Sequence, residues 1–182
     1  MENQTHISMK TERLFMRTVT EADAGMLNEL DKDGAEFASE EAAIKWIRWV
    51  RERNAEGRLI VNFYVWLTQT DECVGRVYIH SKPELDGEIE VGYGMAEEHR
   101  CKGYATEAGK ALVQYAFEKA GQDVLAAIIK PENTASRRVI EKLGVENCGV
   151  RTVPDENNVI CEFDYYRLYR DDWLKRRISA RI

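Results

Sequence analysis

The sequence contains no long apolar run and no closely paired cysteines. No hydrophobic stretch approaches the ~20 residues needed to cross a bilayer. The polar start of the chain also lacks the basic and apolar segments of a secretory signal. The four cysteines are widely spaced, which favours reduced thiols over a zinc site or a disulfide framework. They are Cys73, Cys101, Cys148 and Cys161. We therefore expect a soluble, cytoplasmic protein with no membrane contact and no metal.

Excess positive charge and the common phosphate-binding motifs are missing as well. The 26 Lys and Arg residues against 32 Asp and Glu residues give a net charge of -6. This balance argues against a nucleic-acid partner, and acidity around a pocket would favour a cationic, amine-bearing substrate. There is no G-x-x-x-x-G-K-[ST] sequence, and Gly92-Tyr93-Gly94 lacks the third glycine of a dinucleotide fingerprint. Neither a P-loop nor a Rossmann site is supported.

The chain has the length of one ordinary domain. Its 182 residues can bury a core but are too few for two typical domains. No linker, repeat or low-complexity segment divides it. We predict a single domain over residues 1–182, with residues 1–10 as a flexible N-terminal extension.

Periodicity and capping residues predict alternating strands and helices. The strand-like runs are Thr11 to Thr18, Leu59 to Thr68, Cys73 to His80, Glu88 to Met95, Val124 to Ile129, Val145 to Val153 and Val159 to Tyr169. Helices are expected after the caps Thr20 and Ser39, before Gly121, and between Asn133 or Thr134 and Gly144. The basic residues Lys175 to Arg177 are interpreted as a solvated end. This order predicts an α/β protein of the α+β kind, whose central strand-helix-strand step is parallel in an otherwise antiparallel sheet.

The segment His99 to Thr106 has the features of an anion cradle. It turns from a strand into a helix, so successive backbone N–H groups converge at a helix N-terminus. Gly103 lets the backbone approach an anion closely, while Arg100 and Lys102 add positive charge. Alone, a basic loop with one glycine is more often a solvated turn. The preceding strand carries Gly92 and Gly94, which suggest a bulge or a close approach by another backbone.

These residues resemble the acetyl-CoA-binding motif of the GNAT N-acetyltransferases, because R-x-x-G-x-A follows a strand containing E-V-G-Y. Other segments are similar to the branch that acetylates the N-termini of ribosomal proteins. They are Thr11-Glu12-Arg13-Leu14, Tyr104-Ala105-Thr106-Glu107-Ala108, Asn133-Thr134-Ala135-Ser136 and Glu141-Lys142-Leu143-Gly144. The resemblance implies a GNAT-like, mixed, largely antiparallel twisted sheet of about six to seven strands with about four helices.

The resemblance also implies an enzyme that moves an acetyl group from acetyl-CoA to a primary amine, with a protein N-terminal α-amine as the expected acceptor. Two alternatives remain open. One is a small-molecule amine acetyltransferase of the same fold, and the other is a non-catalytic acyl-CoA-binding regulatory module. The expected partners are acetyl-CoA and the acceptor, and the chain is expected to be a monomer or a homodimer.

By the same resemblance, the strand through Met95 holds the pantetheine arm and the following loop holds the pyrophosphate. The expected cofactor-binding residues are Met95, Arg100, Cys101, Lys102, Gly103, Tyr104, Ala105, Thr106 and Asn133. Two positions depart from the family pattern: Cys101 replaces a common glycine, and Val145 replaces an aromatic residue after Leu143-Gly144. Cys101 keeps its backbone N–H, so main-chain donors remain available.

Glu90 is the candidate general base, because an α-amine with a pKa near 7.7 to 8.0 is mostly protonated at neutral pH. A solvated or arginine-paired carboxylate is an equally good interpretation, and Glu88 and Glu162 are competitors. Ser136 is the candidate acid for the leaving thiolate, although a hydroxyl that only caps the helix is at least as common. The fourth helix lacks the tyrosine acid of many relatives. Unpaired backbone N–H groups at the expected bulge would stabilise the oxyanion.

Overall fold

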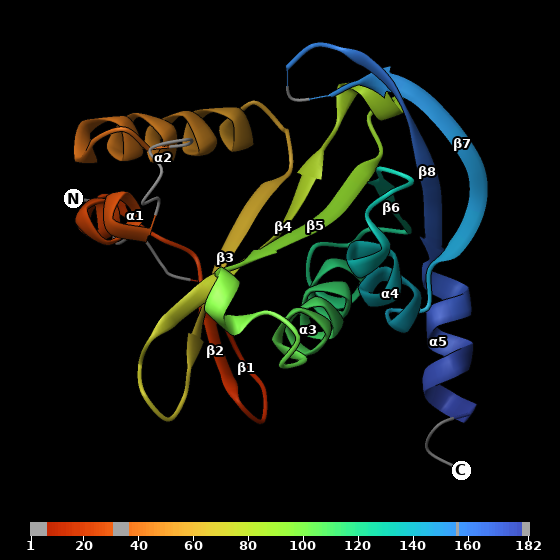
Figure 1. Ribbon diagram of the computed structural model, residues 1–182, viewed down its shortest axis with the longest axis horizontal. Helices are drawn as coiled ribbons and strands as arrows, with labels where there is room; N and C mark the ends of the chain where they lie inside the picture. The colour runs from red at the N-terminus through yellow and green to blue at the C-terminus, as the bar shows by residue number, and fades with distance from the viewer. Residues whose placement is uncertain (1–6, 31–36, 156, 180–182) are drawn as a thin grey trace.

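The computed structural model describes residues 7–30, 37–155 and 157–179. These residues form an eight-stranded sheet in the order β1-β2-β3-β4-β5-β6-β8-β7, with five α-helices and three short 3-10 helices (Figure 1). The expected mixed architecture is therefore confirmed, with one strand and one helix more than the upper expectation. No described helix is long and apolar enough to cross a membrane.

The first five strands form an antiparallel half-sheet. They are β1 Ser8–Lys10, β2 Leu14–Arg17, β3 Ile60–Leu67, β4 Cys73–Ser81 and β5 Ile89–Met95. The predicted meander over β3, β4 and β5 is confirmed. The expected flexible extension is corrected in part, because Ser8–Lys10 pair with β2. Residues 1–6 lie outside the described part of the chain.

The second half-sheet contains β6 Val124–Ile129, β7 Glu146–Pro154 and β8 Ile160–Tyr169. Strand β6 pairs antiparallel with β8, which pairs antiparallel with β7. The two halves meet at β5 and β6, the parallel pair that the strand-helix-strand pattern predicted. Helix α3, Tyr104–Glu118, makes the connection between them.

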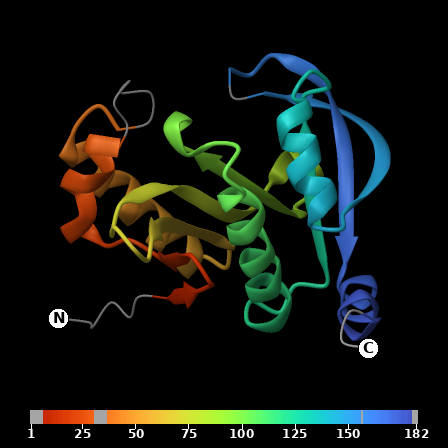
Figure 2. The ribbon, with the colours of Figure 1, turned by 60° about the horizontal axis from the view of Figure 1, so that its bottom comes forward.

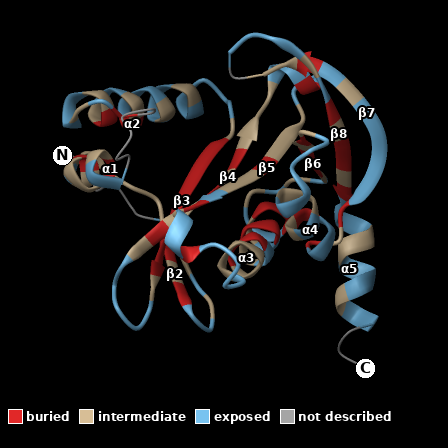
Figure 3. Cartoon of the chain, in the orientation of Figure 1, coloured by how far each residue is buried: buried red, intermediate tan, exposed pale blue. Residues whose placement is uncertain are grey.

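Helices cover both faces of the first half-sheet (Figures 1 and 2). On one face, α3 packs on a core that includes Phe63 and Val65, and α4, Thr134–Lys142, lies beside α3 against β6 of the second half. On the other face, α1, Ala24–Leu30, and α2, Glu40–Ala55, pack around Tyr64 and Trp66. Strand β3 is buried on both faces, which explains its nearly continuous hydrophobic sequence. Figure 3 shows this buried centre, in contrast to the largely exposed edge strand β7.

The caps form largely as the sequence indicated. Ser39 accepts a hydrogen bond from the Ala42 N–H at the start of α2, and Thr20 forms a capping box with Asp23. The Asn133 side chain caps α4. Because these side chains satisfy backbone donors at the helix starts, local sequence was sufficient to locate these starts.

The sequence did not predict a fifth helix, although Lys175 and Arg176 are exposed as expected, and it predicted a bulge in β5 that the structure lacks. The chain end from 170 to 179 is helix α5, Arg170–Ser179, whose Trp173 ring lies 5.2 Å from that of Phe117. The β4–β5 pairing also runs from Ile89 to Met95 without a register shift, so the expected bulge is absent there. A Cβ on Gly92 would overlap the Tyr78 ring, so this glycine makes room for a side chain.

Candidate active site

The sheet opens where its two halves meet. Strands β5 and β6 are paired at Glu90 and Ala126, whereas β5 continues to Met95. Figures 1 and 2 show the two strands diverging, with α3 and α4 beside the opening. Beyond Glu90, β5 therefore has a backbone edge that no described strand covers, and an extended ligand arm can pair with such an edge.

The loop after β5 presents a row of backbone donors. Within the described chain, the N–H groups of residues 101–106 have no internal hydrogen-bond acceptor. Helix α3 begins at Tyr104 immediately after Gly103, whose φ of 85° is in the left-handed region. Unpaired N–H groups at a helix N-terminus attract an anion through both hydrogen bonding and the helix dipole. The loop thus has the donors that a pyrophosphate group requires.

Two side-chain contacts tie this loop to its surroundings. Arg100 Nε donates to the Met95 carbonyl at 3.1 Å, which joins the loop to the end of β5. The buried ring of His99 lies 3.0 Å from Glu72, measured from Nε2 to Oε1. Cys101 adopts a φ of 60°, a left-handed conformation that glycine adopts with less strain than cysteine. Its backbone N–H is nevertheless among the free donors.

Glu90 lies on β5 where the two half-sheets separate. Only 12% of its side chain is exposed, and the nearest Lys82 Nζ–carboxylate oxygen distance is 3.1 Å. Burial raises the pKa of Glu90, and the Lys82 ammonium opposes this rise. The register partner of Glu90 in β4 is His80, whose pKa burial lowers to about 4, so this imidazole is neutral at pH 7. Glu90 is therefore a partly desolvated carboxylate with a single described cationic partner.

The two competing carboxylates occupy different environments. Glu88 is bound by the Arg167 guanidinium and by the Tyr165 hydroxyl, so its oxygens serve a side-chain network. Glu162 is exposed on β8. The alternation of side chains places Glu162 on the face opposite Phe163, whereas Glu90 shares a row with Ala126 on the Phe163 face. Of the three, Glu90 has the least exposed side chain, and it lies at the opening.

Ser136 and Asn133 lie together at the start of α4. The Ser136 N–H donates to Asn133 Oδ1 at 3.0 Å, so the Asn133 side chain has a capping role. Ser136 Oγ accepts a hydrogen bond from the Tyr93 hydroxyl at 3.2 Å. Burial raises the pKa of Tyr93, although the bond to Ser136 lowers it in part. Tyr93 thus remains a proton donor at neutral pH.

Tyr93 was missed in the sequence because its importance depends on a contact across the fold. It is separated from Ser136 by 43 positions. Its alternation along β5 puts it on the α4 face, opposite Glu90. The missing tyrosine of the fourth helix therefore has a counterpart in the adjacent strand. The only available signal was the E-V-G-Y string, which was interpreted as a cofactor-binding strand.

The site contains candidate acid and base groups on opposite faces of the sheet. Glu90 faces the side covered by α1 and α2, whereas Tyr93 and Ser136 face the side of α3 and α4. A reacting group held between the diverging strands can therefore meet a base from one side and an acid from the other. Within the described residues, no three His, Cys, Asp or Glu side chains are arranged to hold a metal ion.

Comparison with known proteins agrees with this geometry. Residues 13–146 match the family described as the acetyltransferase (GNAT) domain. The uncharacterized N-acetyltransferase p20 of Bacillus licheniformis is 26% identical over 151 residues, covering 79% of this chain and 84% of that protein.

Two solved structures show that the fold is shared. RimL, a ribosomal L7/L12 alpha-N-protein acetyltransferase in complex with coenzyme A, has a TM-score of 0.75 and 14% identity, covering 91% of this chain and 99% of its own. The Vibrio cholerae SpeG spermidine N-acetyltransferase F149G mutant has a TM-score of 0.72 and 17% identity, covering 92% and 99%. The sequence match over residues 13–146 identifies the chain as a member of the GNAT acetyltransferase family.

Proposed function

We propose that this protein transfers the acetyl group of acetyl-CoA to a primary amine, and that its acceptor is the α-amine of a protein or peptide N-terminus. The proposal rests mainly on the free N–H groups of residues 101–106, which directly follow β5, a strand with an uncovered edge. A pyrophosphate and an extended pantetheine arm need these two features in this order.

The proposed cofactor residues fall into two groups. Met95 and the preceding β5 backbone hold the arm, and the N–H groups of residues 101–106 bind the pyrophosphate. Arg100 supports this loop through its bond to the Met95 carbonyl, and Lys102 adds an exposed positive charge. The Asn133 oxygen is used by the α4 cap, so contact with the cofactor would come from its exposed amide nitrogen. Acetyl-CoA supplies a thioester whose carbonyl carbon is open to attack by a neutral amine.

Glu90 is proposed to accept the proton that the amine loses. Its burial favours proton uptake, and its place at the strand opening gives access to the gap between β5 and β6. The free N–H groups on the uncovered β5 edge would donate to the developing oxyanion. These N–H groups are free because β6 diverges from β5, and not because of a bulge in β5 as the sequence suggested.

Ser136 is proposed to donate a proton to the leaving thiolate. The Tyr93 hydroxyl donates to Ser136 Oγ, so Tyr93 can replace the proton that Ser136 gives up, and water would return a proton to the Tyr93 phenolate as the products leave. This relay requires no side-chain movement between the two oxygens. The acid is consequently divided between β5 and α4.

An apolar cavity beside β5 favours an N-terminal α-amine over a polyamine. It has a volume of about 210 Å³ and contacts Gly94 and Met95. Its other described lining residues are Leu27, Leu30, Phe37, Tyr64, Gly75, Arg76 and Ala96. Among these described residues, Arg76 carries a positive charge, which would repel a polycation. One small amino-terminal residue suits the cavity in size and polarity.

A screen of acceptors tests the proposal. Purified protein and acetyl-CoA are incubated with short N-terminal peptides, the same peptides with blocked α-amines, spermidine and an aminoglycoside. Acetylation of free α-amines alone is the expected result. Transfer to spermidine or the aminoglycoside alone would support the small-molecule alternative. Raised thermal stability with acetyl-CoA but no turnover with any amine would indicate the regulatory module, and no stabilisation would contradict the cofactor site.

A further inference from the structure

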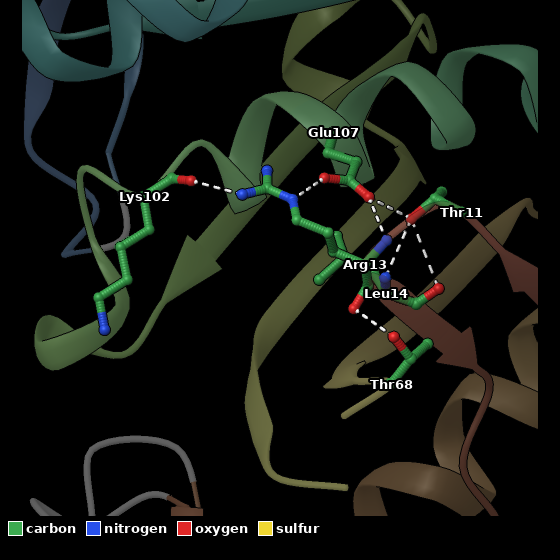
Figure 4. A network of polar contacts seen from close by, with 6 residues as sticks. All are labelled: Thr11, Arg13, Leu14, Thr68, Lys102 and Glu107. Carbon is green, nitrogen blue, oxygen red and sulfur yellow. Dashed lines mark hydrogen bonds and ion pairs between the residues drawn. The ribbon is translucent and has the colours of Figure 1, made fainter. Parts of the chain in front are cut away.

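A polar network connects residues 100–106, which we call the phosphate loop, to the start of β2 (Figure 4). Glu107 Oε1 accepts from Thr11 Oγ1 at 2.6 Å and from the Arg13 backbone N–H at 2.9 Å. Its other oxygen pairs with Arg13 Nε at 2.7 Å. Arg13 Nη1 then donates to the Lys102 carbonyl at 3.1 Å. We call these four residues the Arg13 network; it joins parts of the chain that are far apart in sequence.

The bond to Lys102 fixes the direction of a neighbouring donor. In a planar trans peptide, the carbonyl and the next N–H point in opposite directions, and the described chain contains no cis peptide. Because Arg13 holds the Lys102 carbonyl toward β2, the Gly103 N–H points away from β2. Arg13 also neutralises a carbonyl dipole that would otherwise repel an anion.

The loop needs such external support because its backbone is strained. Cys101 has a φ of 60° and Gly103 a φ of 85°, so two left-handed residues flank Lys102. A non-glycine residue in this region costs free energy and persists when surrounding contacts determine it. The Arg13 guanidinium also lies 4.8 Å from the centre of the Tyr104 ring. One side chain therefore contacts the residues on both sides of Gly103.

Glu107 holds Arg13 in this position. Although burial favours the protonated acid, hydrogen bonds from Thr11 and Arg13 keep the pKa of Glu107 below its ordinary value. Glu107 is thus an anion at neutral pH, and it lies in the first turn of α3, the helix that follows the loop. Because Glu107 belongs to α3, its ion pair fixes the orientation of the Arg13 guanidinium relative to this helix.

We propose that Arg13 is a positioning residue for coenzyme A binding: from behind the loop, it orients the Lys102–Gly103 peptide so that the Gly103 N–H faces the pyrophosphate. The inference rests on the proposed function, since it assigns a role in the same cofactor site. This role needs the planar guanidinium of arginine, because Nε donates to Glu107 while Nη1 donates to the Lys102 carbonyl.

The test compares Arg13→Gln and Arg13→Lys with Arg17→Gln. Arg17 is a matched control at the far end of β2, with an ion pair of 2.6 Å to Asp23 and a Trp66 ring 4.6 Å beneath it. Calorimetry measures the affinity for coenzyme A. Steady-state kinetics over a range of acetyl-CoA concentrations measures KM and kcat, and thermal unfolding without ligand measures stability. Both Arg13 variants should raise the Kd and the KM for acetyl-CoA about tenfold while kcat at saturation is retained. Arg17→Gln should lower thermal stability without changing the Kd.

Three results would overturn the proposal. Wild-type affinity in Arg13→Gln would remove the side chain from cofactor binding. Wild-type affinity in Arg13→Lys would reduce its role to that of a simple charge. A weakened Kd in Arg17→Gln equal to that of the Arg13 variants would make the effect a general loss of stability. If the wild-type protein itself fails to bind coenzyme A, the proposed function fails first, so the two failures are distinguishable.

Discussion

The phosphate loop and the amine side of the sheet are built in opposite ways. The loop, residues 100–106, is contiguous in sequence, and its donors are backbone N–H groups. The amine side depends on a half-buried carboxylate on β5, a lysine after β4, and a mostly apolar cavity lined from several elements. A backbone site can be recognised from a short motif, because the chain direction determines it. A side-chain site depends on which distant residues the fold brings together.

This contrast explains why the donor is easier to identify than the acceptor. A pyrophosphate needs converging backbone donors, so a glycine before a helix start is a local signal for it, which the neighbouring motifs then made specific. The proposed acceptor cavity is lined by side chains from several elements, and no short motif encodes such a lining. Changes in the loop should therefore alter cofactor affinity, and changes around Glu90 should alter turnover.

The largest effect is expected on turnover, from Glu90→Gln. Loss of a general base lowers kcat on the order of 100- to 1,000-fold, whereas the Kd for coenzyme A should stay within about twofold because Glu90 is outside the loop. Steady-state kinetics and calorimetry measure the two quantities. Glu88→Gln is the matched control, since this carboxylate binds Arg167 and Tyr165. A rate loss in Glu88→Gln alone would reverse the assignment.

The loop should show the opposite result in Gly103→Val. A branched side chain at a φ of 85° forces the loop to move, and its Cβ would lie 3.3 Å from Arg13 Nη2. Loss of about 3 kcal/mol of hydrogen bonding to a charged group raises the Kd for coenzyme A roughly 100-fold. Calorimetry with coenzyme A measures it.

Gly121→Val is the control for this loop variant. Gly121 also has a positive φ, of 67°, and its Cβ would meet no atom within 4 Å. It should lower thermal stability yet leave the Kd unchanged. If Gly121→Val weakened coenzyme A binding as much as Gly103→Val does, backbone donors in the loop would not be the cause.

Much of the fold was predictable because its signals are local. Val124 to Ile129 was predicted as a strand with the observed bounds, and Ser39 correctly marked the start of α2. Helix α5 was missed because Lys175 to Arg177 suggested solvent, although Asp171 and Asp172 precede them in the order that suits a helix dipole. What decided the structure was packing against α3, including the contact between Trp173 and Phe117. Such a contact leaves no pattern in the sequence of either helix.

The candidate site was predictable to a similar degree. The backbone cradle followed from residue order, and Glu90 followed from strand alternation. The sequence did not suggest the roles proposed for Tyr93 and Arg13, because their contacts with Ser136 and Lys102 cross 43 and 89 positions. The expected bulge was wrong because Gly92 accommodates the Tyr78 ring rather than an extra residue. Residues that act through distant partners need coordinates to be identified.

A smaller effect on turnover is expected from the α4 side. Ser136→Ala removes the direct proton donor and should lower kcat about tenfold, whereas Tyr93→Phe removes one neutral hydrogen bond and should lower it about threefold. Rapid-quench measurement of a single turnover isolates the chemical step. The double variant should be no slower than Ser136→Ala, because Tyr93 acts through Ser136. Multiplied losses in the double variant would contradict the relay.

The smallest effect at neutral pH, and the sharpest test of the amine side, is expected from Lys82→Met. The Lys82 ammonium opposes the burial that raises the pKa of Glu90, so its removal should raise this pKa further. A base is active above its pKa, so the acid limb of kcat/KM against pH should move to higher pH while the plateau rate is retained. Lys82→Arg keeps the charge and should leave the limb near its wild-type position. If the acid limb stays fixed in Lys82→Met, the group that titrates is not Glu90. The base would then have to belong to the acceptor or to another residue.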